Sequence, residues 1–225
     1  YDPDIVYTYK DNKAHGWVDM RRALAVSSNV YFYTIGGGYG DQKGLGIGRI
    51  EQYTKMFGLD EPTGINMQGE AKGNIPSPEW KERVFNGDDW RIGDTYNTSI
   101  GQYGFQVTPI EMVRAVAALA NGGTLVTPSI TEPLDSETFA KLSFEEEDLQ
   151  VVREGMRMVV TEGGGQLLNS LPFSVAAKTG TAQVGVQKRF VNAWMVGFFP
   201  YEQPRYSFVF LMEHGPGGEA VVGAS

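Results

Sequence analysis

Apolar residues repeat at helical spacing in the first part of the chain. Residues 20–26 carry this pattern behind Asp19, a good helix N-cap, and predict a first helix. A second apolar stretch runs from Val30 to Ile35, and residues 49–57 predict a further short helix. The small polar residues Ser27-Ser28-Asn29 separate the first two stretches, which predicts a turn or helix break there.

Two stretches lack a regular apolar pattern. Residues 36–48 are rich in glycine and predict a flexible connection, and they contain no Gly-x-x-x-x-Gly-Lys-Ser/Thr phosphate loop. Residues 59–104 are rich in Gly, Pro, Asn and Asp with little periodicity. This composition predicts a long irregular excursion.

Two later helices carry clear start signals. Thr108-Pro109-Ile110-Glu111 predicts a capping box with proline at the first helical position, and Ser143-Phe144-Glu145-Glu146 predicts a second capping box. Gly122-Gly123 and Gly163-Gly164-Gly165 are expected to end these helices. The apolar faces are predicted at Ile110, Val113, Ala117 and Ala120 in the first and at Leu149, Val152, Met156 and Val159 in the second.

The last part of the chain changes to a strand pattern. Three segments, Ser174 to Val184, Phe190 to Phe199 and Tyr206 to Met212, are rich in Val, Phe, Tyr and Trp and are separated by turn-forming residues. They predict an antiparallel meander. Helices followed by strands, without regular alternation, predict an α+β fold: an antiparallel sheet flanked by helices.

The amino-acid composition favours a globular domain and excludes several kinds of partner and site. A chain of 225 residues with 41% hydrophobic and 20% charged residues suffices for one well-buried core. The net charge of −8 argues against a nucleic-acid partner. The absence of cysteine excludes disulfides and thiolate metal sites and fits an exported bacterial domain.

Both ends of the sequence predict a chain that is incomplete. It begins at Tyr1 without a signal peptide, and residues 217–225 resemble the opening turn of a helix without its body. No stretch approaches the roughly 18 apolar residues of a membrane span. A membrane anchor is therefore expected outside this chain.

Two short motifs are candidates for chemistry. Ser27-x-Asn29 falls at a helix break, and Lys178-Thr179-Gly180 falls in the first predicted strand, 151 residues later. A strand lysine beside hydroxyl groups suits recognition of a carboxylated peptide, because Lys178 supplies a cation and Thr179 and Thr181 supply hydroxyl donors.

The remaining residues of the motifs have roles in the same interpretation. Gly180 leaves room for an extended substrate along the strand edge, and the backbone N–H near Thr181 suits half of an oxyanion hole. Ser27 could shuttle a proton, and Asn29 could hydrogen-bond a substrate amide.

Structural interpretations of the same residues stay open at this point. Ser27-Ser28-Asn29 could simply end one helix and cap the next. Lys178 could be a solvated strand lysine, and Gly180 could mark a β-bulge. In addition, no lysine of the chain has a serine three residues before it, so the Ser-x-x-Lys arrangement of an activated nucleophile is absent.

Longer blocks resemble the transpeptidase domain of class B penicillin-binding proteins, closest to the penicillin-binding protein 2 (cell elongation) type. The blocks are His15-Gly16 with Ala25 to Tyr33, Lys72 to Pro76 with Glu79-Trp80-Lys81, Gly93 to Gln102 with Thr108 to Met112, and Ala177 to Gln183. The blocks are spread over nearly the whole chain. Gln102-Tyr103-Gly104 departs from the Gly-Gln-Gly order of the family, which puts the local loop geometry in doubt.

The resemblance implies a fold shared with serine β-lactamases and a serine acyl-transfer reaction on peptidoglycan stem peptides ending in D-Ala-D-Ala, with β-lactams attacked in the same way. It implies that the nucleophilic serine and its lysine base lie upstream of Tyr1, so residues 1–225 are a partial transpeptidase domain, lacking that segment and a C-terminal helix. It implies these site residues: Ser27, Asn29 and Lys178 as catalytic, and Thr179, Gly180 and Thr181 as substrate-binding.

The resemblance also implies expectations about cofactors, partners and cellular location. Some relatives carry zinc near a histidine like His15, with carboxylates and a cysteine, but this chain has no cysteine, so His15 is interpreted as structural and no cofactor is expected. An anchor and cell-elongation partners are expected only through the missing N-terminal part, on the extracytoplasmic face of a bacterial membrane. The alternatives are a non-catalytic penicillin- or peptidoglycan-binding sensor, a D,D-carboxypeptidase and, with no Glu-x-x-Leu-Asn segment between the motifs, least of all a β-lactamase.

Overall fold

The structure is a computed structural model, and it describes residues 7–131, 140–185 and 189–216. Its helices are α1 (Met20–Val26), α2 (Asn29–Gly37), α3 (Ile47–Met56), α4 (Pro78–Val84), α5 (Ile92–Ser99), α6 (Pro109–Ala120), α7 (Glu146–Glu162) and the 3-10 helix η1 (Gln166–Ser170). Its strands are β1 (Thr124–Leu125), β2 (Ala140–Lys141), β3 (Ala176–Val184), β4 (Phe190–Phe199) and β5 (Tyr206–Pro216).

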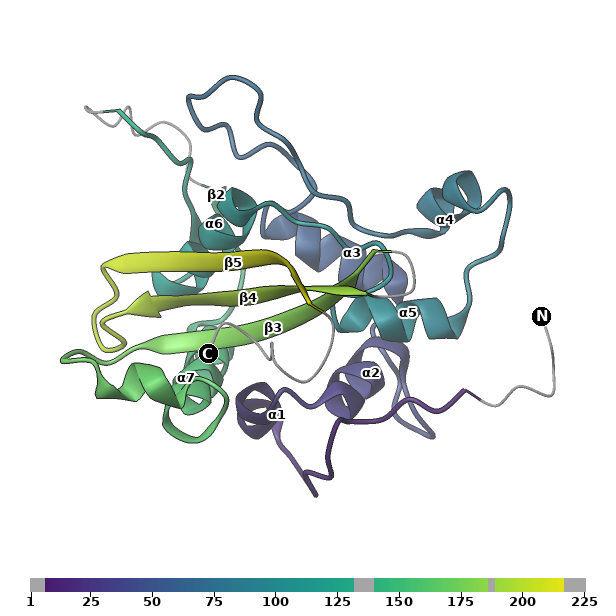
Figure 1. Cartoon of the computed structure of the whole chain (residues 1–225), viewed down its shortest axis with the longest axis horizontal. Coiled ribbons are helices and arrows are strands. Elements are labelled where there is room, and N and C mark those ends of the chain that lie inside the picture. Colours follow the sequence, from purple (N-terminus) through teal and green to yellow (C-terminus); the bar gives the residue numbers. More distant parts are fainter. Residues whose placement is uncertain (1–6, 132–139, 186–188, 217–225) are drawn as a thin grey trace.

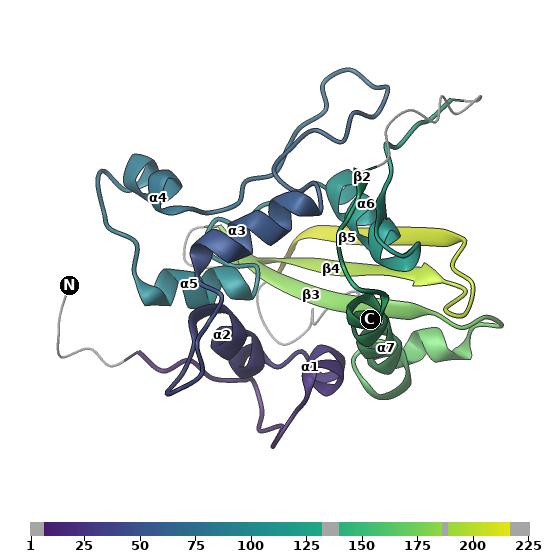
Figure 2. The ribbon, with the colours of Figure 1, turned by 180° about the vertical axis from the view of Figure 1, so that it is seen from behind.

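The main sheet has the order β3-β4-β5, and both pairings are antiparallel. Helices α6 and α7 pack on one face of it, which is the face toward the viewer in Figure 2. The central contact joins Val116 and Ala120 of α6 with Met156 of α7 and with Ala176 and Phe198 of the sheet. This sheet-and-helix core confirms the predicted α+β fold.

Helices α1 and α2 lie beyond the β3 edge (Figure 1). Helix α1 packs on α7, and α2 packs on α5 (Figure 1). Strand β3 is the edge of the three-stranded sheet that lies nearest to α1 and α2. The functional region is therefore bounded by a sheet edge on one side and by helix ends on the other.

Most predicted elements are confirmed. Helices lie at 20–26, 29–37, 47–56 and 109–120, and the three strands form the predicted meander. Thr108 and Glu111 form a reciprocal capping box: the Glu111 N–H donates to Thr108 Oγ1 at 3.2 Å, and the Thr108 N–H donates to Glu111 Oε2 at 2.6 Å. The predicted helix opening in residues 217–225 lies outside the described residues.

The prediction of an irregular excursion over residues 59–104 is wrong in part, because α4 and α5 lie within it. Helix α4 begins with a Ser77 cap whose hydroxyl accepts from the Trp80 N–H at 3.1 Å, followed by Pro78. This start signal was present in the sequence. Both helices are only 7 and 8 residues long, too short to show a clear helical period.

The glycine-rich stretch 36–48 is not a loose connection. A Cβ on Gly36 would sit 1.7 Å from Ser99 Oγ, and one on Gly37 would sit 2.3 Å from a ring atom of Tyr96. These glycines therefore allow α2 to pack closely on α5. Composition alone does not separate this use of glycine from flexibility.

Two details of the later helices also differ from prediction. Helix α7 begins after Glu145 without a side-chain cap, so the predicted capping box at Ser143 is wrong. The buried face of α6 includes Glu111, Ala115 and Ala118, whereas the predicted positions Val113 and Ala117 are only partly buried. The α6 face is rotated because a buried carboxylate, Glu111, belongs to it.

Candidate active site

One large cleft, of about 1680 Å³, lies between the β3 edge, the α1–α2 break and the end of α5. All six predicted site residues line it: Ser27, Asn29, Lys178, Thr179, Gly180 and Thr181. The two motifs, 151 residues apart in sequence, therefore meet across one cleft, as the sequence predicted.

Ser27 lies at the end of α1 in a left-handed conformation, with φ 54° and ψ 50°. The Ser28 N–H donates to the Ala23 carbonyl at 3.0 Å, a bond typical of the Schellman motif. Glycine is the usual residue at such a position, because a Cβ is strained there. The chain instead places a serine hydroxyl at the mouth of the cleft.

Ser28 and Asn29 start helix α2. The Ser28 hydroxyl accepts from the Tyr31 N–H at 3.2 Å and donates to Asp11 Oδ2 at 2.9 Å, while Asp11 Oδ1 accepts from the Val30 N–H at 3.1 Å. Asp11 thus fixes the turn that presents Ser27 and Asn29. Sequence reasoning missed Asp11, because no local pattern links it to a motif that begins sixteen residues later.

Lys178 points from β3 to the α1–α2 break. Its ammonium group donates to Ser27 Oγ and, at 2.7 Å, to the Thr179 carbonyl. Burial of the ammonium group lowers the pKa of Lys178 to about 8. Lys178 is therefore not a solvated strand lysine, and the group that it contacts is the hydroxyl predicted to move a proton.

Gly180 does not mark a bulge. Its pairing with Trp194 continues an unbroken β3–β4 register from Ala176 to Val184. In the described sheet β3 pairs only with β4, so its other edge faces the cleft. Both structural interpretations of this motif are thereby excluded, whereas Ser27 and Ser28 do end one helix and cap the next in addition to lining the cleft.

The end of α5 supplies a third wall that the sequence did not predict. Gln102 Nε2 donates to the Thr181 carbonyl at 3.5 Å, and Tyr103 lines the cleft with φ 63°. Tyr103 is one of the few described residues other than glycine with a positive φ, so its side chain is presented to the cleft from a left-handed backbone.

Charge in the cleft is one-sided. Among the described residues, the lining includes Lys178 and Arg189 but no Asp or Glu, although the chain as a whole carries a net charge of −8. Clefts lined by one sign of charge attract ligands of the other sign. The cleft therefore suits an anionic ligand such as a carboxylate.

His15 lies outside the cleft lining, and its Nε2 is buried without a hydrogen-bond partner among the described residues. Within residues 7–131, 140–185 and 189–216, no group of three or more His, Cys, Asp or Glu side chains is placed to hold a metal ion. The same residues contain no helix long and apolar enough to cross a bilayer.

Sequence comparison identifies relatives along nearly the whole chain. The family profile described as "Penicillin binding protein transpeptidase domain" matches residues 3–224. Peptidoglycan D,D-transpeptidase MrdA of Acinetobacter baumannii is 30% identical over 241 residues, which cover 96% of this chain and 35% of the relative. MrdA of Haemophilus influenzae is 29% identical, with 97% and 37% covered. The chain thus spans little more than a third of the length of these curated relatives.

Solved structures give the same assignment. A complex of penicillin-binding protein PBP2 with MreC from Helicobacter pylori has a TM-score of 0.78 and 34% identity, covering 91% of this chain and 38% of that one. Pseudomonas aeruginosa PBP2 in complex with WCK 5153 has a TM-score of 0.79 and 29% identity, covering 95% and 49%. Fold, motif pairing and both comparisons agree: the chain belongs to the penicillin-binding protein transpeptidase family, in its class B, penicillin-binding protein 2 (MrdA) type.

Proposed function

We propose that this chain forms the substrate-binding and proton-relay part of a peptidoglycan D,D-transpeptidase, and that the nucleophilic serine belongs to a Ser-x-x-Lys segment of the intact protein outside residues 1–225. The observation that carries the proposal is the hydrogen bond from Lys178 to Ser27 across a cleft that strand β3 borders. The absence of Ser-x-x-Lys from the chain is consistent with it.

The reaction follows from these positions. The nucleophilic serine gives its proton to its lysine base and attacks the carbonyl between the two terminal D-Ala residues, the C–N bond breaks, and the last D-Ala leaves as its amine. Ser27 gives its hydroxyl proton to that leaving nitrogen and takes up the proton held by the lysine base, and Lys178 holds the Ser27 hydroxyl in place for the transfer. An amine from a second stem peptide then takes the acyl group.

The other lining residues bind the donor peptide. Thr179 and Thr181 hydrogen-bond its terminal carboxylate, Asn29 binds an amide, and the N–H near Thr181 stabilises the oxyanion. Gly180 keeps the strand edge open for an extended peptide.

We place the intact protein on the extracytoplasmic face of a bacterial cytoplasmic membrane, with its anchor in a segment outside this chain. Its partners in this proposal are peptidoglycan stem peptides, β-lactams and cell-elongation proteins. The PBP2 relative from Helicobacter pylori forms a complex with MreC, which supports a partner of that kind here.

Labelling with a fluorescent penicillin tests the proposal. The intact protein is expected to form a covalent adduct, and the 225-residue chain alone is not. Lys178→Ala in the intact protein is expected to slow acylation by about 10²-fold or more, the loss typical of a proton-transfer or electrostatic group. His15→Ala, with no assigned chemistry, is the control and should acylate at the parental rate once circular dichroism has shown that it is folded. A folded Lys178→Ala protein with the parental rate contradicts the assignment.

A second candidate function is a binding or sensor module without catalysis. The observation in its favour is that the chain contains no Ser-x-x-Lys. In that case the intact protein binds penicillin reversibly, and mass spectrometry finds no adduct. If an adduct forms, product analysis with a stem pentapeptide, with and without an amine acceptor, separates transpeptidase from D,D-carboxypeptidase and β-lactamase activity.

A further inference from the structure

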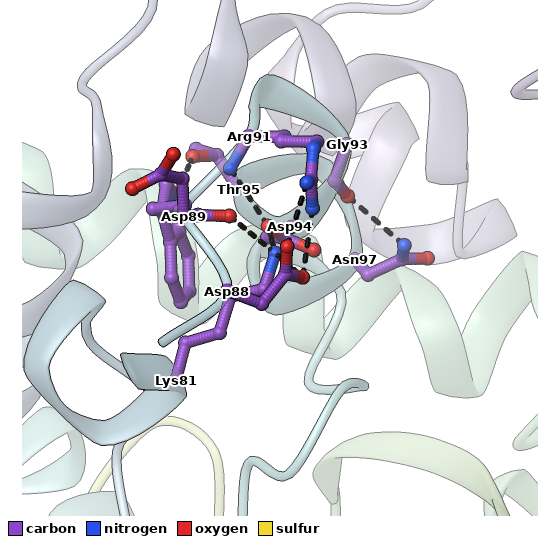
Figure 3. Close-up of polar contacts among 9 residues, drawn as sticks. Lys81, Asp88, Asp89, Arg91, Gly93, Asp94, Thr95 and Asn97 are labelled. Atoms are coloured by element: carbon purple, nitrogen blue, oxygen red, sulfur yellow. Dashed lines mark hydrogen bonds and ion pairs between the residues drawn. The ribbon is translucent and has the colours of Figure 1, made fainter. Parts of the chain in front are cut away.

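Lys81 of helix α4 is buried, with a side chain only 2% exposed, and it takes no part in the proposed reaction. Its ammonium group donates to the Asp89 carbonyl at 2.5 Å and to Asp94 Oδ2 at 2.7 Å, and lies 2.9 Å from Asp88 Oδ2 (Figure 3). All three of its protons therefore have acceptors. A lysine is almost never buried to this degree unless it is paired in this way.

The acceptors belong to the start of helix α5. Asp94 Oδ2 also accepts from the Arg91 N–H at 2.7 Å, and the Arg91 guanidinium donates to both oxygens of Asp88 at 2.6 and 2.8 Å (Figure 3). Burial acts to lower the pKa of Lys81, but the hydrogen bonds to Asp94 and Asp88 outweigh it and raise the pKa. The cluster Lys81–Asp88–Arg91–Asp94 thus holds two cations and two anions and joins α4 to α5.

The residues beside Lys81 on α4 support the third wall of the cleft. The Tyr103 ring meets Trp80 edge-on at 5.8 Å and lies parallel to Phe85 at 6.0 Å. The Lys81 ammonium lies 6.0 Å from the centre of the same ring. A Cβ on Gly104 would sit 2.5 Å from Trp80, so the chain after Tyr103 is pressed against α4 as well.

Tyr103 needs this support because its backbone is strained. A left-handed conformation costs a residue with a Cβ about 1–2 kcal/mol, and such a residue persists only where its surroundings fix it. Tyr103 lines the cleft, and its neighbour Gln102 reaches the Thr181 carbonyl on β3. The position of α4 therefore decides whether this wall keeps its shape.

We propose that Lys81 is a positioning residue for the acylation reaction: its ion cluster fixes α4, and α4 holds Tyr103 in the conformation that forms the cleft wall beside β3. This inference rests on the proposed function and deepens it, because it makes Tyr103 the side chain that orients the donor peptide or penicillin. A misplacement of about 1 Å at such a wall can cost 10²-fold in rate.

The test compares Lys81→Met, Tyr103→Ala and the double variant in the intact protein. The readouts are the second-order rate of acylation by a fluorescent penicillin and the hydrogen exchange of residues 99–104. Lys81→Met is expected to slow acylation at least about 10-fold, with faster exchange in that segment. Because Lys81 acts through Tyr103, adding Lys81→Met to Tyr103→Ala should cost less than about twofold more.

Two controls separate this role from a general loss of stability. Lys55→Met removes a surface lysine paired with Glu51 on α3 and should leave both readouts at parental values. Leu125→Ala opens a core cluster that lines no part of the cleft, and below its melting temperature it should acylate normally. If Lys81→Met does not fold, Asp94→Asn replaces it, with the same expected direction.

Two results would overturn the inference. The first is an acylation rate of Lys81→Met within twofold of the parent. The second is a double variant whose fold-loss in acylation rate equals the product of the two single losses. A parent protein that forms no adduct instead refutes the proposed function. Hydrogen exchange then decides the positioning role alone. Faster exchange of residues 99–104 in Lys81→Met but not in Lys55→Met supports it, and unchanged exchange rejects it.

Discussion

At the scale of single residues, Ser27 combines two demands that conflict. The end of α1 requires a left-handed residue, where glycine is the least strained, while the cleft requires a hydroxyl within reach of Lys178. The structure keeps the hydroxyl and accepts the backbone strain. Strain that persists in this way is common where a side chain has a function.

This conflict gives a prediction about stability. Ser27→Gly and Ser27→Ala both remove the hydroxyl, but only glycine relieves the left-handed strain, so the glycine variant should be more stable than the alanine variant by about 1 kcal/mol. Thermal or urea unfolding of the two variants in the intact protein measures the difference, and both should lose penicillin acylation. An alanine variant as stable as the glycine variant would show that the backbone at residue 27 is not strained.

The lowered pKa of Lys178 gives a prediction about pH. With a pKa of about 8, the ammonium form that donates to Ser27 is present below that pH and is lost as the pH rises through it. Acylation is therefore expected to fall above about pH 8. Lys178→Arg keeps its charge throughout this range, so the fall near pH 8 should disappear even if the overall rate is lower.

A pH–rate profile of both proteins is the measurement. If the fall near pH 8 persists in Lys178→Arg, it belongs to another group, such as the base of the nucleophile.

The sequence predicted the residues of the two motifs, but it did not predict the residues that hold them in position. Ser27, Asn29 and Lys178 could be chosen because their residue types and order carry chemistry, and the structure does bring them together. The residues that were not predicted act through contacts between distant segments. Asp11 accepts a hydrogen bond from the Ser28 hydroxyl, and Gln102 donates one to the Thr181 carbonyl. Tyr103 lines the cleft beside Gln102. No short-range period records such contacts.

At the scale of elements, the long strands and the longer helices were predictable because their apolar repeats are local signals. The segments that were missed, α4 and α5, are held by tertiary contacts instead: the Lys81 cluster, and the glycines of α2 against Tyr96 and Ser99. Helix α6 shows both cases. Its capping box was predicted from residues 108–111. Its buried face was not predicted, because Glu111 also accepts hydrogen bonds from backbone N–H groups far away in the sequence.

Glu111 is fully buried and accepts from three backbone N–H groups: those of Thr108 at 2.6 Å, Gly73 at 2.9 Å and Asp60 at 3.1 Å. It thereby joins the start of α6 to the segment before α4. Without its carboxylate, these partly buried donors lose their partner. A fully buried group left unpaired costs about 1–3 kcal/mol, and three donors are affected here.

Glu111→Ala is accordingly expected to lower the free energy of unfolding by about 3 kcal/mol or more. Urea unfolding of the intact protein measures this, with Glu147→Ala as the control, since Glu147 is an exposed residue in the first turn of α7 and should change stability by about 0.5 kcal/mol or less. Equal effects of the two substitutions would mean that the Glu111 contacts contribute nothing beyond a helix-end charge.

At the scale of the whole molecule, the described helices α6 and α7 cover one face of the sheet (Figure 2). Alternate residues of β5 point to one face, and three of them, Tyr206, Phe210 and Met212, are 58–60% exposed. Such a row of large apolar side chains is typical of a surface that another segment covers. We therefore expect the intact domain to place a further segment, such as the C-terminal helix predicted from the sequence, on this row.

Substitution at Phe210 tests that expectation in the intact protein. If a further segment covers the row, Phe210→Asp buries a charge there and should lower the free energy of unfolding by at least about 2 kcal/mol. Tyr39→Asp is the control, because Tyr39 is 81% exposed in the loop after α2, and its replacement should cost no more than about 0.5 kcal/mol. Urea unfolding of the two variants decides the matter. Equal small losses would mean that the β5 row faces solvent in the intact protein and that its sheet is covered on one face alone.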